Sequence, residues 1–345
     1  MKHSFRNDYS EMSHPRILEA LSMVENRQFE GYGLDEYSRR ATEILRKMMD
    51  APVADIHFLS GGTQANLIAI SSALRPHEAV IAPSTGHIFV HEAGSIEATG
   101  HKVCTRVGHN GKLQVNDIVS VLDEHEDEHM VKPRLVYISL STESGTVYTK
   151  PELSSISAFC RNNGLYLYID GARLGAGINS AMCDLTYSDV AALADMFFIG
   201  GTKNGFLFGE AIVICNDALK ADFRFHLKQH GALLSKGAAI GLQFEVMFRD
   251  GLYDELAGHS NKMAKRLATG IKTLGYEFLY PPETNLIIPI FSQEIAEKMH
   301  KLYGFYDWAK LENNMVAVRL LTSWATTEGA VDEFLKDLGS AKGKY

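Results

Sequence analysis

Seven short runs rich in β-branched and aromatic residues are spread over the first 216 residues, with longer stretches of helical period between them. This alternation is typical of βαβ units, in which helices join parallel strands and cover the faces of their sheet. We therefore expect an α/β fold with a mainly parallel seven-stranded sheet and helices on both faces. The predicted strands are 54–60, 79–83, 101–107, 134–140, 165–170, 196–201 and 210–216.

A helix is expected after every strand of this sheet, most clearly at 63–75, 91–100 and 150–164, where apolar residues recur at helical spacing. Beyond residue 240 the pattern changes to one long helical stretch, 240–274, followed by short apolar runs and two further helices. This change predicts a large domain, residues 1–240 with an N-terminal arm, and a smaller C-terminal α+β domain, residues 241–345.

The composition excludes some kinds of partner. A formal net charge of −8 lacks the basic excess that nucleic-acid binding requires, so we expect no nucleic-acid partner. No apolar run approaches the roughly 18 residues of a membrane span, so we expect no membrane partner. The four cysteines form no CxxC pair, and free thiols of this kind fit a cytoplasmic protein.

Four of the predicted strand ends carry residues that could bind a ligand or take part in catalysis. In a parallel sheet, ligands bind beyond the carboxyl ends of the strands. There the sequence places a glycine turn with Gly62 and Thr63, then His87, then Asp170 with Arg173, and finally a glycine-flanked pair, Thr202 and Lys203. Taken singly, each has an ordinary structural explanation: a tight turn, a packed histidine, or a helix cap with a surface ion pair.

One ligand would explain these strand ends together. Pyridoxal 5′-phosphate has a phosphate for the glycine turn and Thr202, and an aldehyde that forms a Schiff base with a lysine such as Lys203. Its pyridine nitrogen needs an acid such as Asp170, which keeps that nitrogen protonated so that the ring can accept electrons. The planar guanidinium of Arg173 would bind an amino acid's carboxylate through two hydrogen bonds.

The chain resembles the family of threonine aldolases and β-eliminating lyases, which depend on pyridoxal phosphate and share the fold type I of the aspartate aminotransferase class. The resemblance covers nearly the whole chain. Its most specific motifs are GGTQANL (61–67), His87 with HEAGSIEATG (91–100), IDGARL (169–174), GGTKNG (200–205) and VRLLTSWATTEGAVDEF (318–334).

The resemblance implies a role for each matching residue. Lys203 would be the Schiff-base lysine, Asp170 the partner of the pyridine nitrogen, and His87 would stack on the ring. It also implies phosphate contacts from Gly62, Thr63 and Thr202, and substrate carboxylate contacts from Arg173 and Arg319. Tyr32 and Asn7 are weaker matches to substrate-binding positions. By its position in MVAVRLL alone, Arg319 would be typical of an exposed residue on an edge strand.

The sequence departs from the family pattern in three places. The serine that relatives carry after the N-terminal arginine is Asn7 here, which can still contact a carboxylate or a phosphate. Where relatives carry a histidine after the fourth strand, this chain has Ser141-Thr142-Glu143, so Glu143 is a candidate for acid–base work or for binding the substrate hydroxyl. His87 or an ordered water remains an alternative. Where relatives place a cation that reaches a neighbouring subunit's phosphate, the nearest is Lys236. If Lys236 substitutes, the active site lies at a subunit interface of a homodimer or homotetramer.

The implied reaction is retro-aldol cleavage of the Cα–Cβ bond of a β-hydroxy amino acid, L-threonine or L-allo-threonine, to glycine and acetaldehyde. β-Elimination or transamination of an amino acid is the alternative. No metal site is expected, because HEDEH (125–129) is typical of a solvated charged loop. A nicotinamide-dependent dehydrogenase would need G-x-G-x-x-G, which GGTQAN lacks. A non-catalytic regulator with this fold is disfavoured by Lys203, Asp170 and both arginines.

Overall fold

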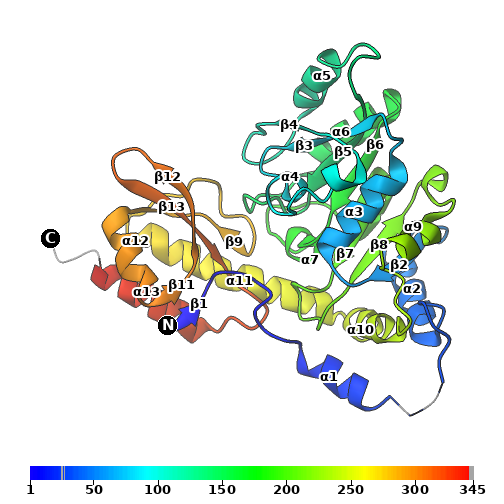
Figure 1. Cartoon of the computed structure of the whole chain (residues 1–345). Coiled ribbons are helices and arrows are strands. Elements are labelled where there is room, and N and C mark those ends of the chain that lie inside the picture. Colours follow the sequence, from blue (N-terminus) through cyan, green and yellow to red (C-terminus); the bar gives the residue numbers. More distant parts are fainter. Residues whose placement is uncertain (25, 27, 342–345) are drawn as a thin grey trace.

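The computed structural model describes residues 1–24, 26 and 28–341. A seven-stranded sheet forms the centre of the larger part of the molecule, in the order β2-β8-β7-β6-β5-β3-β4 (Figure 1). The predicted α/β class and all seven predicted strands are confirmed. The strands are β2 (Asp55–Leu59), β3 (Glu78–Pro83), β4 (Val103–Arg106), β5 (Lys132–Ser139), β6 (Tyr166–Asp170), β7 (Met196–Gly200) and β8 (Glu210–Ile214).

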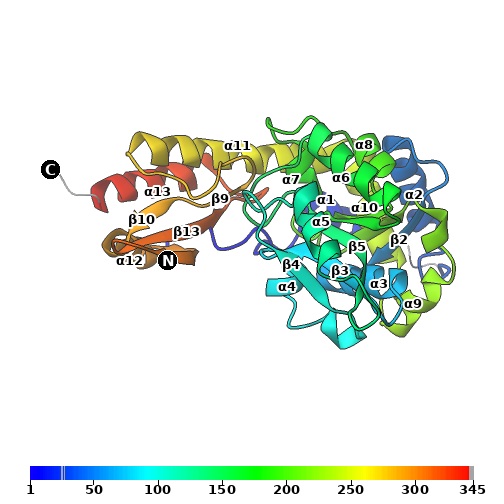
Figure 2. The same ribbon diagram turned by 90° about the horizontal axis from the view of Figure 1, so that it is seen from above.

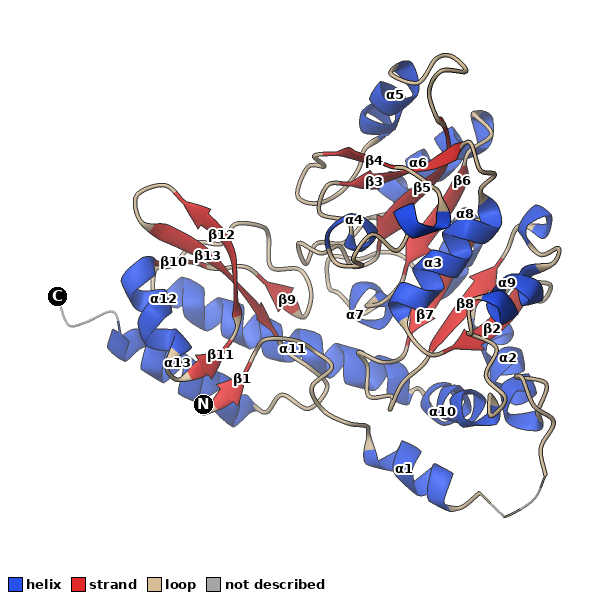
Figure 3. Cartoon of the chain, viewed as in Figure 1, coloured by secondary structure: helices blue, strands red, loops and turns tan. Residues whose placement is uncertain are grey.

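Helices cover both faces of this sheet, as the sequence predicts (Figure 3). Along β6, Leu167 and Ile169 pack with the helices of one face, whereas Tyr168 packs with those of the other. This alternation buries both faces, as parallel sheets require. One face carries α3 (Gly62–Ala73) and α9 (Phe223–Gln229); the other carries α2 (Glu36–Met48), α5 (Val115–Asp123), α6 (Lys150–Asn162), α8 (Tyr187–Leu193) and α10 (Ala238–Arg249).

The expectation of a helix after every strand is wrong between β7 and β8. Residues 201–209 connect these two strands without a helix, and β8 runs antiparallel to both β7 and β2. A connection of this length is too short for a crossover, which takes a dozen or more residues, so the chain turns straight back. The turn carries Lys203.

Two predicted helices also differ. Segment 91–100 forms turns and one short 3-10 helix, η1 (Glu97–Thr99), because Ala93 adopts φ +52° and interrupts helical geometry. The stretch 240–274 is divided into α10 and α11 (Leu252–Thr273), since Gly251 adopts the left-handed region with φ +73°. The remaining short elements are α1 (Pro15–Ser22), α4 (His87–Val90), α7 (Leu174–Ile178) and η2 (Asp217–Leu219).

The C-terminal part forms a second sheet, in which β13 (Met315–Leu321) pairs with β9 (Leu286–Ile287), β10 (Ile290–Ser292) and β12 (Tyr306–Leu311). Helices α11, α12 (Gln293–His300) and α13 (Glu328–Ala341) pack on it. The N-terminal strand β1 (His3–Ser4) lies against β11 (Tyr303–Gly304), and Lys2 forms an ion pair with Asp337 of α13, so the N-terminal segment packs on this part.

The long helix α11 runs from the large sheet to the small one (Figure 2). Its first turns, with Leu252 and Leu256, pack in the core of the large part, whereas Met263 and Leu267 pack in the core of the small part. The division into domains 1–240 and 241–345 remains a proposal, and this packing would place its boundary within α11. In the described residues, no helix combines the length and apolar character that a membrane crossing needs.

Candidate active site

A cavity of about 640 Å³ lies between the carboxyl ends of the central strands and the small sheet. It is lined from the large part by residues that include His87, Glu143, Arg173 and Lys203, and from the small part by β12 and β13 with Arg319. A smaller space of about 30 Å³ adjoins it, shares His87, Glu143, Arg173 and Lys203, and extends to Gly62 and Asp170. The structure thus brings together side chains from six separate segments.

Asp170 ends β6, and its carboxylate is held in place by three donors. The Asn66 amide donates to Oδ2 at 2.9 Å, the Tyr137 hydroxyl donates to the same oxygen at 2.8 Å, and the Ala172 backbone N–H donates to Oδ1 at 2.9 Å. Asp170 is 4% exposed. A carboxylate has about four acceptor sites, so this one still has room for one more donor from the cavity side.

Lys203 lies in the short turn between β7 and β8. Burial lowers the pKa of its amine, and the positive charge of Arg173 lowers it further. A lysine whose neutral form is favoured is a better nucleophile toward a carbonyl group. At the start of β8, directly after this turn, buried Glu210 accepts a hydrogen bond from the Gly201 N–H at 2.8 Å. Burial raises the pKa of Glu210 to about 7.

His87 is the first residue of α4, which begins directly after β3. Its Nδ1 lies 2.7 Å from Oε1 of Glu92, and the buried Glu92 also accepts hydrogen bonds from Asn66 and Ser95. This contact with Glu92 holds the His87 ring in a fixed orientation. Asn66 therefore connects the carboxylate of Glu92, the partner of His87, with the carboxylate of Asp170.

Arg173 forms a bidentate ion pair with Asp8, with Nε donating at 2.6 Å and Nη2 at 2.9 Å. Burial alone would raise the pKa of Asp8, but the charges of Arg173 and Lys203 lower it below its usual range. The pair is almost fully buried. It fixes the guanidinium at the cavity wall, where Arg173 is one of the lining residues.

Arg319 lies on β13, which is central in the small sheet rather than an edge strand, so the exposed-edge interpretation is wrong. Its guanidinium lies 5.9 Å from the ring centroid of Trp308, and its buried Nε has no hydrogen-bond partner among the described residues. Burial, followed by the nearby charge of Arg173, lowers its pKa to about 10. A buried cation without an acceptor is costly unless an anion binds to it.

Glu143 is carried by the loop after β5. Its Oε1 accepts hydrogen bonds from the His87 backbone N–H at 3.0 Å and from the Ser139 hydroxyl at 2.7 Å, whereas Oε2 has no partner in the described residues. Burial raises the pKa of Glu143, and the charge of Asp170 contributes to the rise.

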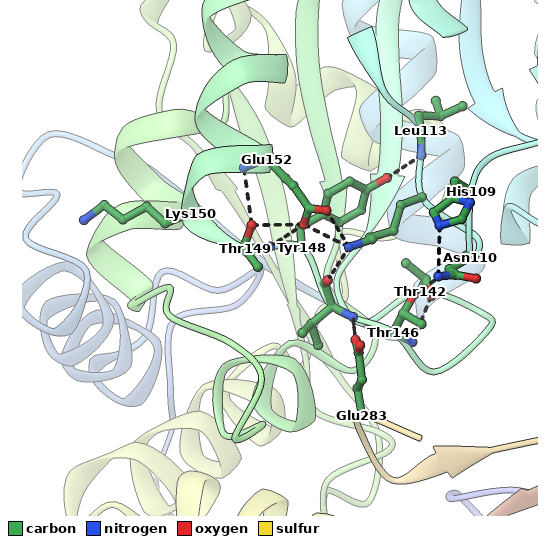
Figure 4. Close-up of polar contacts among 12 residues, drawn as sticks. His109, Asn110, Leu113, Thr142, Thr146, Tyr148, Thr149, Lys150, Glu152 and Glu283 are labelled. Atoms are coloured by element: carbon green, nitrogen blue, oxygen red, sulfur yellow. Dashed lines mark hydrogen bonds and ion pairs between the residues drawn. The ribbon is translucent and has the colours of Figure 1, made fainter. Parts of the chain in front are cut away.

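The loop that carries Glu143 is anchored on both sides (Figure 4). The Thr142 and Thr146 hydroxyls lie 2.7 Å apart, Thr146 donates to the Asn110 carbonyl at 2.8 Å, and Glu283 accepts from the Val147 N–H at 2.8 Å. Gly145 adopts φ +82°, and a Cβ there would lie 2.2 Å from the Leu286 carbonyl oxygen. The loop therefore holds Glu143 rigidly against the cavity.

The predicted phosphate ligands lie at the start of α3 and beside Lys203. Gly61 caps α3 without a side-chain hydrogen bond, so the first N–H groups of this 12-residue helix are available to an anion. Gly62 lines the smaller space, and Thr63 is the next residue of the helix. The Thr202 hydroxyl accepts a hydrogen bond from the Gly209 N–H at 3.1 Å.

Besides Thr63 and Thr202, three further predicted residues do not line the cavity. The Asn7 side chain accepts hydrogen bonds from Tyr9 and Ser10 in its own turn. Tyr32 is 42% exposed, and the Lys228 ammonium lies 4.7 Å from its ring centroid. Lys236 lines a separate cavity of about 400 Å³ beside α10. Within one chain, Tyr32 and Lys236 therefore belong to a different surface from Lys203.

Sequence reasoning missed four residues at this site: Asp8, Asn66, His91 and Glu92. Asn66, His91 and Glu92 lie inside the motifs GGTQANL and HEAGSIEATG, so the signal was present but not assigned to a side chain. Asp8 lies far from Arg173 in sequence, and no local pattern connects the two.

The residues fit pyridoxal phosphate. Besides the lysine and the buried carboxylate, three buried polar atoms of cavity-lining residues have no partner in the described chain: Thr85 Oγ1, Glu143 Oε2 and Arg319 Nε. Buried polar atoms are normally hydrogen-bonded, so three at one cavity indicate that a polar, partly anionic ligand completes it. No group of three or more metal-ligating side chains occurs among the described residues.

Comparison with known proteins agrees with this geometry. Residues 12–294 match the model of the beta-eliminating lyase family. A low specificity L-threonine aldolase of a Pseudomonas species is 32% identical over 331 residues, which cover 94% of this chain and 93% of that protein. A solved structure of Leishmania major threonine aldolase is 48% identical, with a TM-score of 0.96 and coverage of 98% and 99%. A mutant aspartate aminotransferase of Thermus thermophilus, 14% identical with a TM-score of 0.74 and coverage of 98% and 91%, shares the fold.

Proposed function

The chain belongs to the beta-eliminating lyase family, and on that premise we propose that it is a pyridoxal-phosphate-dependent lyase that cleaves L-threonine or L-allo-threonine to glycine and acetaldehyde. The observation that carries the proposal is the meeting of Lys203, Asp170, Arg173 and Arg319 around one cavity. A Schiff-base lysine, an acid for the pyridine nitrogen and two carboxylate-binding cations meet the needs of an amino-acid substrate.

The cofactor-binding residues follow from the contacts above. Asp170, supported by Asn66 and Tyr137, would pair with the pyridine nitrogen, and the oriented ring of His87 would lie against the cofactor. The start of α3, with Gly62 and Thr63, and the Thr202 hydroxyl would hold the phosphate. When bound, the cofactor supplies the electron-accepting ring that takes up the electrons of the broken Cα–Cβ bond.

The substrate-binding residues are separate from these. Arg319 has a buried N–H without an acceptor, and Arg173 is fixed nearby by Asp8, so both can orient the α-carboxylate. This orientation leaves the β-hydroxyl to the remaining wall of the cavity, where Glu143 Oε2 can accept a hydrogen bond from it. Asn7 and Tyr32 stay weaker candidates, because neither lines this cavity.

The names of the relatives favour aldol cleavage over β-elimination and transamination. The relatives compared above are a low specificity L-threonine aldolase and a threonine aldolase. We also retain two further parts of the proposal. The enzyme is a homodimer or homotetramer in which Lys236 of a second subunit completes the phosphate site, and it is cytoplasmic, as its four free cysteines suggest.

The test is an absorbance spectrum of the purified protein incubated with pyridoxal phosphate, combined with an acetaldehyde assay. We expect a visible band that Lys203→Ala abolishes, and acetaldehyde release from L-threonine or L-allo-threonine. A band without acetaldehyde would move the function to elimination or transamination. Absence of the band would contradict the cofactor itself.

A further inference from the structure

His91 is a cavity residue for which the proposed roles do not account. It follows α4 directly and lines the same cavity as Lys203, Arg173 and Arg319. Its ring centroid lies 5.4 Å from that of His87, with the two ring planes inclined by 55°. The two histidines therefore lie side by side at the cavity wall.

The two rings differ in their partners. Nδ1 of His87 is engaged with the buried Glu92 at 2.7 Å. The ring of His91, in contrast, makes no hydrogen bond to any residue in the described part of the chain. A neutral imidazole has one nitrogen that can accept a proton, and in His91 no protein group occupies it.

The charges around His91 favour its neutral form. Burial lowers the pKa of His91, and the positive charges of His87, Arg319, Lys203 and Arg173 lower it further. Two acidic residues, Glu143 from the loop after β5 and Asp307 from β12, also line the cavity. The net effect is a lowered pKa, so the imidazole is ready to accept a proton near neutral pH.

Glu143 is the less suitable acceptor. Its Oε1 already accepts two hydrogen bonds, and burial raises its pKa. Because its raised pKa favours the protonated carboxyl, Glu143 is suited to hydrogen-bond the substrate hydroxyl, whereas the group that removes the hydroxyl proton should be in its unprotonated form.

We propose that His91 accepts the proton of the substrate's β-hydroxyl during Cα–Cβ cleavage, an inference that rests on the proposed function. The hydroxyl O–H bond breaks and the proton moves to an imidazole nitrogen. The oxygen's electrons form the C=O bond of acetaldehyde as Cα–Cβ breaks. The pair from that bond stays at Cα, stabilised by the cofactor, until Cα takes up a proton and glycine is formed.

The test separates hydroxyl deprotonation from the other steps. For His91→Asn in the cofactor-loaded enzyme, we expect kcat for L-allo-threonine cleavage to fall by about 10²- to 10⁴-fold, as for loss of a general base. Exchange of the α-hydrogen of glycine with solvent D₂O, followed by NMR, needs no hydroxyl base. The rate of this exchange and the absorbance of the visible cofactor band should stay within about threefold of the wild-type values, because only the hydroxyl base is removed.

The pH profile gives a second readout. In wild type, kcat/KM for cleavage should fall on the acid side as His91 becomes protonated, with an apparent pKa below 6.5. His91→Asn should lose this dependence. The matched control is His77→Asn, an exposed histidine directly before β3, which should cleave like wild type. Glu143→Gln should raise KM more than it lowers kcat.

Three results would overturn the proposal. Cleavage by His91→Asn at close to the wild-type rate would show that another group takes the proton. Equal losses of cleavage and glycine exchange would assign His91 a structural role. A wild-type enzyme with glycine exchange but no cleavage would reject both this inference and the aldolase function, whereas no exchange and no band would reject the cofactor.

Discussion

At the scale of single residues, the cavity is defined by polar groups that are left incomplete. Arg319 Nε, Glu143 Oε2 and Thr85 Oγ1 are buried without partners in the described chain. Each incomplete group costs free energy in the empty protein and regains it when a ligand binds. Replacing such a group should therefore leave the unliganded protein as stable or more stable, and should weaken ligand binding.

Arg319→Leu tests this trade. Because the replaced cation is half-buried and its buried Nε lacks an acceptor in the described chain, the unliganded variant should be as stable as wild type or more stable in thermal unfolding. Glycine binding to the cofactor-loaded variant should weaken by about 100-fold or more, as measured by titration calorimetry, because a buried charge pair with the carboxylate is lost. Arg319→Lys should restore part of the affinity. A marked fall in Tm would contradict the interpretation of Arg319 as a ligand-binding residue.

Glu210 gives a prediction about pH. Its pKa is raised from 4.5 to about 7 in the folded protein, so between these values the folded state holds a proton that the unfolded state has lost. Stability from this group is therefore complete below pH 4.5 and lost as the pH rises to about 7. One unit of pKa difference corresponds to about 1.4 kcal/mol. In urea unfolding of the cofactor-free protein, wild type should lose stability relative to Glu210→Gln over this range.

The control for this experiment is Glu126→Gln, which replaces an exposed carboxyl. Its stability should follow that of wild type at every pH. If Glu210→Gln also gives a curve parallel to wild type, the raised pKa of Glu210 is wrong.

At the scale of elements, Asp8 joins three segments. It binds Arg173 at the start of α7 and accepts a hydrogen bond from Asn285, before β9, at 3.0 Å. The N-terminal segment thereby connects the large sheet to the small one beside the cavity. This connection rests on one buried, bidentate ion pair.

Asp8→Asn should reduce the free energy of unfolding by about 3 kcal/mol at pH 7, because it leaves Arg173 buried without its counter-charge. The lowered pKa of Asp8 means that the pair contributes above the unfolded value of 3.8 and is lost as the pH falls through the folded value. The difference between variant and wild type in urea unfolding should therefore shrink in acid.

The chain offers a matched control. Asp332 accepts two hydrogen bonds from Arg266, each at 2.8 Å, but this pair is exposed. Asp332→Asn should cost no more than about 1 kcal/mol. Equal effects of the two substitutions would show that burial of the Asp8 pair does not matter.

At the scale of the whole molecule, the cavity of one chain does not contain every predicted ligand. Lys236 and Tyr32 lie on another surface, where Lys228 and Ser235 are their neighbours. We expect a second subunit to bring this surface to the phosphate site. The active enzyme should then be at least a dimer by light scattering.

Mixing two inactive variants tests this arrangement. Lys203→Ala lacks the Schiff-base lysine, and Lys236→Ala lacks the phosphate cation, so each homodimer should be nearly inactive. In a mixed dimer, one of the two sites has both lysines and should be active. Refolding the two variants together should restore up to about a quarter of wild-type activity, since half of the dimers carry one intact site. No recovery would place Lys236 outside the neighbouring site.

The strands of the large sheet and the candidate residues at their ends could be predicted from the sequence, but not every helix could. Strand periodicity and β-branched composition are local properties, so all seven strands were predictable. Strand-end motifs identified Lys203, Asp170 and Arg173, because a parallel sheet brings such ends to one edge.

The meeting of groups that lie far apart in the sequence could not be predicted from it. Contacts between segments far apart in sequence determine four features of the site. These are the reversal of β8, the central place of Arg319 in its sheet, the Asp8–Arg173 pair and the position of His91 at the cavity. The helix and strand propensities of single residues do not predict such contacts, because the contacts depend on burial and charge pairing across the assembled core. The strand-end residues of the site could therefore be proposed from the sequence, whereas the contacts that support them could not.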